Sequence, residues 1–107
     1  MRARRSGMAG AAATAWLAGL AIAARAEPPL AVPALAATCA ACHGTQGHAI
    51  DGATVPGLAG LPAGYLAEQM KGFKQGNRQA TVMNQIAKGY SQAQIEQLAA
   101  FFAAQKK

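Results

Sequence analysis

The sequence is poor in charged and aromatic residues, which limits the classes of protein that it fits. Charged residues make up 13% of the 107 residues and aromatic residues 6%, whereas 52% are hydrophobic. Such a chain is not a disordered or acidic solvating segment. Its length allows one domain and excludes a large multidomain enzyme. It also lacks alternating runs of β-branched residues, so we expect helices rather than strands.

Acidic residues are scarce as well, four against ten basic ones, but the formal charge of +6 is misleading. Three of the basic residues stand at the very start of the chain, namely Arg2, Arg4 and Arg5. An uncharged run over residues 8–24 follows and ends at an Ala-Arg-Ala triplet. A basic start, an apolar centre and such a small-residue exit predict a secretory signal peptide over residues 1–26. The mature chain, residues 27–107, then carries +2 and no basic stripe with interleaved aromatics, so no nucleic-acid partner is expected.

A long, strongly apolar run is also missing. The uncharged run has 17 residues, mostly alanine and glycine, whereas a transmembrane helix needs about 20 predominantly apolar residues. We therefore expect cleavage after Ala26 and export to the periplasm of a Gram-negative bacterium. The alternative is an uncleaved segment that anchors the protein in the membrane.

The mature chain has only two cysteines, Cys39 and Cys42, which lie three residues apart and cannot cross-link distant elements. A domain of 81 residues buries only about 60–65% of its unfolded surface, which leaves a thin core. Small exported domains usually compensate with disulfides or with a bound group. We therefore expect a bound group to complete this core.

Residues 39–43 read Cys-Ala-Ala-Cys-His, the attachment pattern of c-type haem. Residues i and i+3 share one face of a helix, so Cys39 and Cys42 can both reach the vinyl groups at one edge of a porphyrin. His43 then lies below the ring centre and can ligate the iron. One such pattern predicts one covalently attached haem c, with both thiols consumed as thioethers.

Two other kinds of site share part of this pattern. A redox-active dithiol of the thioredoxin kind belongs to a βαβ context, which this chain does not offer. A structural zinc site needs four ligands, and beyond the motif the mature chain offers His48 and a few carboxylates. Covalent haem is therefore the prediction.

Three main helices are expected in the mature chain, at residues 35–42, 62–76 and 91–105. Prolines 28, 29 and 33 delay the start of the first helix, and the glycine- and proline-rich residues 44–60 form a loop. In the second helix, one mostly apolar face consists of Leu66, Gln69, Met70 and Phe73. The third helix has Ser91 as its N-cap in a capping box with Gln94. Its apolar stripe, at helical spacing, consists of Ile95, Leu98, Ala99 and Phe102.

The iron needs a second axial ligand, and three side chains of the mature chain qualify. Met70 belongs to the apolar face of the second helix, which favours core packing. His48 follows His43 by five residues in a loop and cannot easily reach the opposite face of the ring. Met83, 40 residues beyond His43, allows the chain to wrap around the haem edge and return. We therefore expect His43 and Met83 as ligands, a pair that raises the reduction potential and leaves no open position for substrate.

With these residues in place, the chain resembles class I c-type cytochromes from about Leu35 to Gln105. The resemblance implies the all-α cytochrome c fold, in which the first and last helices cross, here through Ala36 and Ala37 against Phe101 or Phe102. It also implies that a proline carbonyl accepts the imidazole N–H and that a nearby leucine packs on the ring. The matching positions in this chain are Pro56 and Leu58.

A more specific resemblance, to the monohaem cytochrome subunits of flavocytochrome c sulfide dehydrogenases, rests on three stretches, 38–44, 58–70 and 83–91. It implies an electron-transfer subunit, not an enzyme, whose FAD-containing partner oxidises sulfide and passes electrons through the haem to a downstream cytochrome or oxidase. The alternative is a free-standing carrier, for which Lys71, Lys74, Arg78 and Lys88 would form a charged docking ring. A haem peroxidase would need an open iron position and a distal acid–base residue, and neither is evident.

Overall fold

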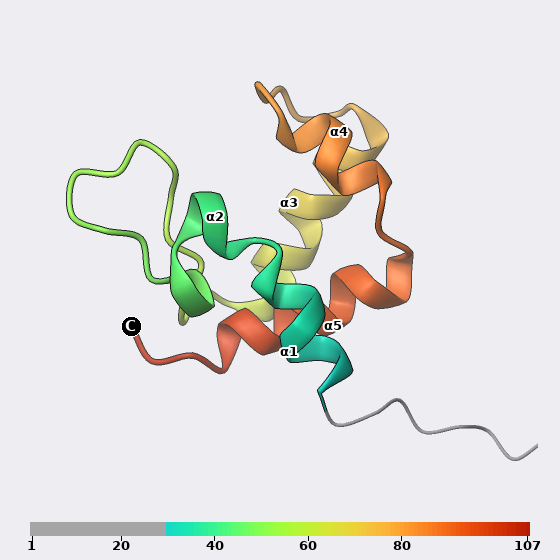
Figure 1. Ribbon diagram of the computed structural model, residues 1–107. Helices are drawn as coiled ribbons and strands as arrows, with labels where there is room; N and C mark the ends of the chain where they lie inside the picture. The colour runs from blue at the N-terminus through green and yellow to red at the C-terminus, as the bar shows by residue number, and fades with distance from the viewer. Residues whose placement is uncertain (1–29) are drawn as a thin grey trace, which may run out of the picture.

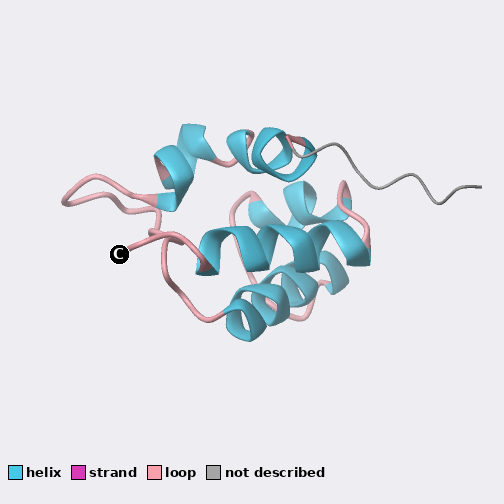
Figure 2. Cartoon of the chain, turned by 90° about the horizontal axis from the view of Figure 1, so that it is seen from below, coloured by secondary structure: helices cyan, strands magenta, loops and turns pink. Residues whose placement is uncertain are grey.

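The fold is built from short helices joined by loops (Figures 1 and 2). The computed structural model of the chain describes residues 30–107, and the signal peptide expected over residues 1–26 lies outside them. The α-helices of the described part are α1 (Ala31–Ala37), α2 (Ala40–His43), α3 (Ala63–Gln75), α4 (Met83–Lys88) and α5 (Gln92–Ala103), with a short 3-10 helix η1 (Thr45–Gly47). Residues 30–107 contain no strand, and the all-α prediction is confirmed for them.

The prediction of one first helix at residues 35–42 is wrong in both its start and its continuity. Helix α1 begins at Ala31, ahead of Pro33, because a proline in the first turn needs no N–H partner. The helix is also interrupted at Thr38 and Cys39, whose backbone N–H groups bond to carbonyls only three residues back. The Thr38 hydroxyl donates to the Leu35 carbonyl oxygen at 2.7 Å, a side-chain bond of the kind that bends helices.

The second and third expected helices are confirmed as α3 and α5. Helix α3 follows Pro62 and ends before Gly76, whose φ of 77° is the left-handed cap conformation that glycine adopts readily. Helix α5 opens with the expected capping box. The Ser91 hydroxyl accepts from the Gln94 N–H at 3.1 Å, and the Gln94 side-chain oxygen accepts from the Ser91 N–H at 2.9 Å.

Helix α4 was not expected, because no helix was predicted between residues 76 and 91. Its six residues, Met83–Lys88, are too few for a helical repeat of apolar residues to be recognised. Helix α4 packs against α3 (Figure 1). The segment that begins with Met83 is therefore a packed helix and not an irregular loop.

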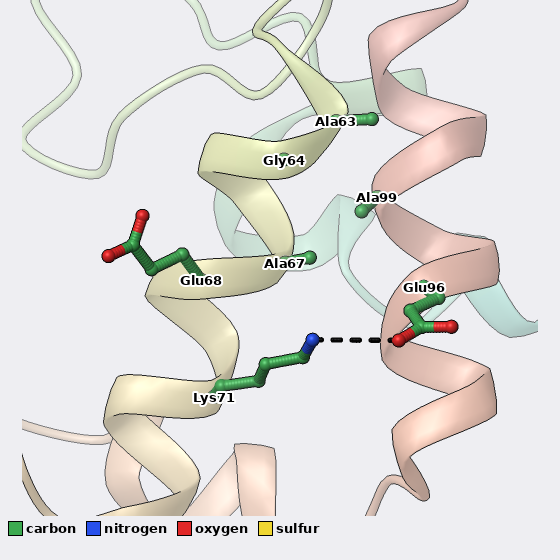
Figure 3. Close-up of a pocket in the computed structure, with 7 residues that line it drawn as sticks. All are labelled: Ala63, Gly64, Ala67, Glu68, Lys71, Glu96 and Ala99. Atoms are coloured by element: carbon green, nitrogen blue, oxygen red, sulfur yellow. Dashed lines mark hydrogen bonds and ion pairs between the residues drawn. The ribbon is translucent and has the colours of Figure 1, made fainter.

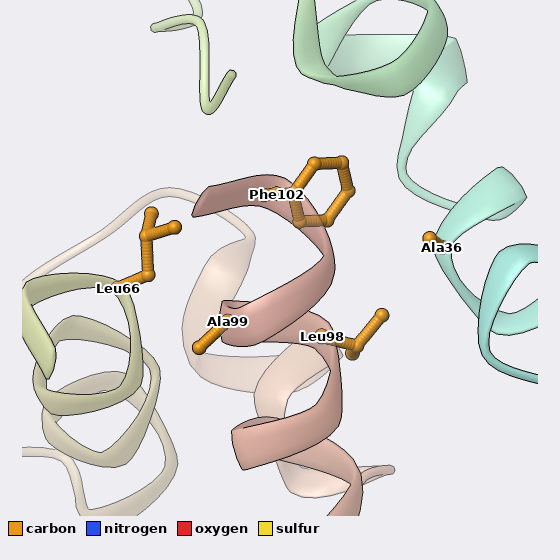
Figure 4. Close-up of a cluster of buried hydrophobic side chains, with 5 residues drawn as sticks. All are labelled: Ala36, Leu66, Leu98, Ala99 and Phe102. Atoms are coloured by element: carbon orange, nitrogen blue, oxygen red, sulfur yellow. The ribbon is translucent and has the colours of Figure 1, made fainter. Parts of the chain in front are cut away.

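The core lies where α5 passes between α1 and α3 (Figure 4). Its buried side chains are Ala36, Leu66, Leu98, Ala99 and Phe102. Leu98 points toward Ala36 of α1, and Ala99 faces the side of α3 (Figure 4). All four residues of the expected α5 stripe are buried, as predicted, and Ala36 meets α5 as expected. Ala37 is exposed, so its expected packing against Phe101 or Phe102 is wrong.

No helix within residues 30–107 is both long and apolar enough to cross a membrane.

Candidate haem site

A cavity of about 410 Å³ opens between α2, α3 and α4. This volume falls within the range of about 300–1,000 Å³ that is usual for sites of small molecules and cofactors. Its walls come from α2, the loop at residues 54–58, the inner face of α3, the segment 78–82 and α4. Chain segments far apart in the sequence therefore enclose one largely apolar space.

His43 is held in a single orientation at this cavity. Its ring nitrogen Nδ1 lies 2.6 Å from the carbonyl oxygen of Pro56. Because a carbonyl oxygen can only accept, Nδ1 carries the proton and donates, which leaves the lone pair of Nε2 free for a metal. The hydrogen bond implied for these two residues is thus present, and it orients the ring and makes the imidazole a better donor to iron.

The two cysteines differ in their surroundings. Cys42 is exposed and lines the cavity beside His43, whereas Cys39 is half-buried against the hydrophobic core. Burial raises the pKa of the Cys39 thiol. A raised pKa keeps the thiol protonated, which is the opposite of what a redox-active dithiol requires.

The structure brings two methionines to the cavity. Met83, the first residue of α4, and Met70 of α3 both line it, and both are half-buried. The expectation that Met70 packs in the core is wrong, because the buried cluster on α3 ends with Leu66, one turn earlier. Met70 lies on the flank of α3 that lines the cavity together with Gln69 and Phe73, whereas the next residue, Lys71, bonds to Glu96 of α5.

Leu58 and Pro56 lie in the loop that closes the cavity on the side of α2. Leu58 lines the cavity and also packs against the core. Its N–H donates to the Gly47 carbonyl oxygen at 2.8 Å. The wall carrying the Pro56 carbonyl is therefore held by the backbone of η1.

His48 lies away from the cavity and is exposed, as the sequence analysis expects. Its ring is nevertheless bonded on both sides, with Nε2 2.6 Å from the Lys106 carbonyl oxygen and Nδ1 3.1 Å from the Thr45 carbonyl oxygen. His48 thus connects the loop after the haem motif to the end of the chain.

Three of the four basic residues considered for a docking ring have partners within the chain. Lys71 forms an ion pair with Glu96 at 3.5 Å, and Lys74 donates to the Tyr90 carbonyl oxygen. The guanidinium of Arg78 lies 4.5 Å from the ring centre of Phe73, a cation–π contact. Among the described residues, these three side chains thus help to pack α3. They do not point only toward a partner protein.

A second hollow lies between α3 and α5, away from the haem motif (Figure 3). Small side chains such as Ala67 and Ala99 line its floor, and the Lys71–Glu96 ion pair crosses it. The pKa of Glu96 is lowered, first by the hydrogen bond from Gln92 and then by that from Lys71 and its charge. The hollow offers no thiol, imidazole or thioether, and we assign no chemistry to it.

The residues at the large cavity fit a covalently attached haem. They provide the Cys42 thiol, an imidazole with Nε2 free, a thioether from α4 and a largely apolar lining, whereas the Cys39 thiol, three residues earlier, lies against the core and not in the cavity wall. Within residues 30–107, no group of three or more His, Cys, Asp and Glu side chains could hold a metal ion. The zinc site weighed from the sequence therefore has no ligand set in that part of the chain.

Comparison with known proteins agrees with this class of site. Residues 31–106 match the protein-family model of cytochrome c. The chain is 46% identical over 72 residues to the thiosulfate dehydrogenase electron acceptor of Thiomonas intermedia, covering 67% of this chain and 33% of that protein. It is 37% identical over 68 residues to the cytochrome subunit of sulfide dehydrogenase of Chlorobaculum tepidum, covering 64% and 60%. It is 36% identical over 72 residues to cytochrome c-554(548) of Halomonas halodenitrificans, covering 64% and 86%.

The fold and the site thus define an all-helical protein with covalent haem c. The chain belongs to the cytochrome c family, whose members bind covalent haem c and transfer electrons. It spans about a third of the thiosulfate dehydrogenase electron acceptor and three fifths of the sulfide dehydrogenase subunit.

Asn84, directly after the cavity residue Met83, and Tyr90, two residues after α4, have contacts that the sequence did not reveal. The side-chain amide of Asn84 donates to the carbonyl oxygens of Arg78 at 2.7 Å and of Phe73 at 3.2 Å. The Tyr90 hydroxyl lies 3.0 Å from that of Thr38. Both contacts join residues that have no periodic relation in the sequence.

Replacing Asn84 by alanine is expected to lower the free energy of unfolding by about 1–3 kcal/mol, because the Arg78 carbonyl oxygen loses this donor and the Phe73 carbonyl oxygen keeps only the Gly76 N–H. Asn84→Asp should be at least as damaging, since a carboxylate would face those same oxygens. Thermal unfolding of the holoprotein measures both. Asn77→Ala is the matched control, because the Asn77 amide bonds only locally to Gln75 at an exposed site. Equal melting temperatures for the Asn84→Ala variant and the wild type would show that the amide does not hold α4.

Proposed function

We propose that this chain is a monohaem electron-transfer subunit that accepts electrons from a sulfide-oxidising flavoprotein outside the cytoplasmic membrane. The observation that carries the proposal is the convergence of Cys42, His43 and Met83 on one apolar cavity, with the His43 ring fixed by Pro56. Haem c, once bound, supplies reversible one-electron chemistry. The residues around it determine where that electron is held and how easily it leaves.

The proposed roles follow from chemistry and position. Cys39 and Cys42 would form the two thioether links, and His43 and Met83 would hold the iron. A neutral thioether favours the reduced metal, so this pair gives a higher reduction potential than two histidines would. With both axial positions taken, the protein transfers electrons and does not transform a substrate, so it is not an enzyme in its own right.

The partner is proposed from similarity and from the distribution of charge. The chain is similar to a cytochrome subunit of sulfide dehydrogenase and covers 60% of that protein's length. Lys71, Lys74 and Arg78 are engaged within the chain, which favours a permanent partner over a shuttle that docks through a ring of free charges. An FAD-containing subunit would then oxidise sulfide, and a downstream cytochrome or oxidase would remove the electrons.

A second candidate partner is a thiosulfate dehydrogenase, because a relative with 46% identity is an electron acceptor of that enzyme. Both candidates place the chain beside a dehydrogenase of reduced inorganic sulfur compounds. The free-standing carrier is the remaining alternative.

The proposed location is the periplasm. Support comes from residues 1–26, which read as a cleavable signal peptide. Should that segment remain uncleaved, it would tether the cytochrome to the membrane instead.

The test is affinity capture of the full chain, tagged after Lys107 and expressed at its native level in its own host. We expect a stoichiometric flavoprotein in the captured complex, with an FAD absorbance that sulfide bleaches before the haem is reduced. A captured complex that lacks flavin and reduces the haem with thiosulfate favours the second candidate. Capture of the cytochrome alone, with reduction by neither compound in cell extract, contradicts the subunit proposal.

A further inference from the structure

The Tyr90 hydroxyl lies between two segments that carry different parts of the site. Its oxygen is 3.0 Å from the hydroxyl oxygen of Thr38, which in turn is 2.7 Å from the Leu35 carbonyl oxygen. Because a carbonyl oxygen can only accept, the Thr38 proton is committed to Leu35. The Tyr90 O–H therefore donates to Thr38, and the direction of this short chain of hydrogen bonds is fixed.

On its own side, Tyr90 is attached to the end of α4. Its N–H donates to the carbonyl oxygen of Ala87 at 3.3 Å, and Ala87 is fully buried. The ammonium group of Lys74 donates to the Tyr90 carbonyl oxygen, and the Tyr90 side chain packs against the core. Tyr90 thus follows any displacement of α4, the helix that begins with Met83.

On the other side, Thr38 belongs to the haem-attachment segment. It immediately precedes Cys39, with its hydroxyl 4.0 Å from the cysteine sulfur, and it sits in the break between α1 and α2. The bonds from Asn84 and Lys74 connect α4 and its C-terminal end to α3 and to the loop after it. The Tyr90–Thr38 bond, in contrast, connects the α4 end directly to the segment that carries the thiols and His43.

We propose that Tyr90, through its bond to Thr38, is a positioning residue that fixes the separation of Met83 from His43 across the cavity. The inference rests on the proposed ligation by Met83. Loss of the bond frees the end of α4 from the haem-attachment segment, so the Met83 thioether leaves the iron more often. A small external ligand then competes with it more successfully.

Cyanide titration of the oxidised holoprotein measures this competition. Tyr90→Phe keeps the ring and removes the hydroxyl, and we expect cyanide to bind about tenfold more tightly, the effect of one lost hydrogen bond. Thr38→Val should give the same increase and Thr38→Ser almost none, since serine keeps the hydroxyl. The double variant Tyr90→Phe, Thr38→Val should bind cyanide no more tightly than either single variant, because each single variant already removes the same Tyr90–Thr38 bond.

Ser91→Ala is the matched control. It removes the cap of α5 next to Tyr90 and costs about 1 kcal/mol of stability, but it leaves the hydroxyl pair intact. If the cyanide affinity rises as much in Ser91→Ala as in Tyr90→Phe, the cause is a general loss of stability and the inference is overturned. An unchanged cyanide affinity in Tyr90→Phe overturns it as well. If Tyr90→Phe fails to fold, Thr38→Val decides by the same two criteria. The weak far-red absorbance of a ferric haem with a methionine ligand tests the premise separately. If this absorbance persists in Met83→Leu, the Met83 ligation is refuted, independently of the Tyr90 result.

Discussion

Replacing Met83 by leucine is expected to abolish the weak far-red absorbance of a methionine-ligated ferric haem and to lower the reduction potential by about 0.2 V. Leucine has nearly the same volume, so the change removes the sulfur without leaving a cavity. Axial ligands set haem potentials over about 0.8 V, and the loss of a soft neutral donor moves the value downward. Absorbance spectra and potentiometric titration of the purified holoprotein measure the two effects.

Met70→Leu is the control for this prediction, because Met70 is half-buried at the same cavity, one helix away. It should keep the band, and its potential should stay within about 0.05 V of the wild type, since surroundings alter a potential less than an axial ligand does. The reverse result, with the band lost in Met70→Leu and kept in Met83→Leu, would assign the ligand to α3. This pair of variants is needed because the structure brings both sulfurs to one cavity.

The chemistry of the site was more accessible to sequence reasoning than its geometry. Cys39, Cys42 and His43 belong to one short motif, so their spacing in the sequence is enough to predict that they act together. That Met83 can reach the cavity wall followed from its distance along the chain, while its ligation of the iron stays a prediction. Pro56 was implied by resemblance alone, since nothing in a glycine-rich loop shows which carbonyl will face the imidazole.

Local structure was predicted well where a repeated signal existed and poorly where one side chain decided the outcome. Helix α5 has a capping box and four apolar residues in register, and both were found as expected. The break at Thr38 depends on a single hydroxyl that bonds to its own helix. Helix α4 is shorter than two full turns, so no periodicity could show it. The role of Met70 depended on which flank of α3 faces the cavity and which faces α5, a property of the packed structure.

Replacing Gly44 by alanine is expected to have the second large effect, a loss of at least about 3 kcal/mol of stability. Gly44 has φ 82° and ψ 162°, a region that is essentially restricted to glycine and costs other residues about 1–3 kcal/mol. A Cβ atom there would also lie 1.9 Å from the carbonyl oxygen of His48. That oxygen is backbone and cannot rotate away, so the turn directly after His43 would have to shift.

A loss of this size should lower the melting temperature by more than about 12 °C, given about 4–8 °C per kcal/mol for a domain of this length. Gly52→Ala separates the two causes, since Gly52 has φ 78° but no described atom within 4 Å of its Cβ position. It should cost only the left-handed penalty of about 1–2 kcal/mol. Gly64→Ala, inside α3 with the same free space, should gain about 0.5–1 kcal/mol. Equal melting temperatures for Gly44→Ala and Gly52→Ala would mean that the turn after His43 yields, and that the imidazole is not held by a rigid backbone.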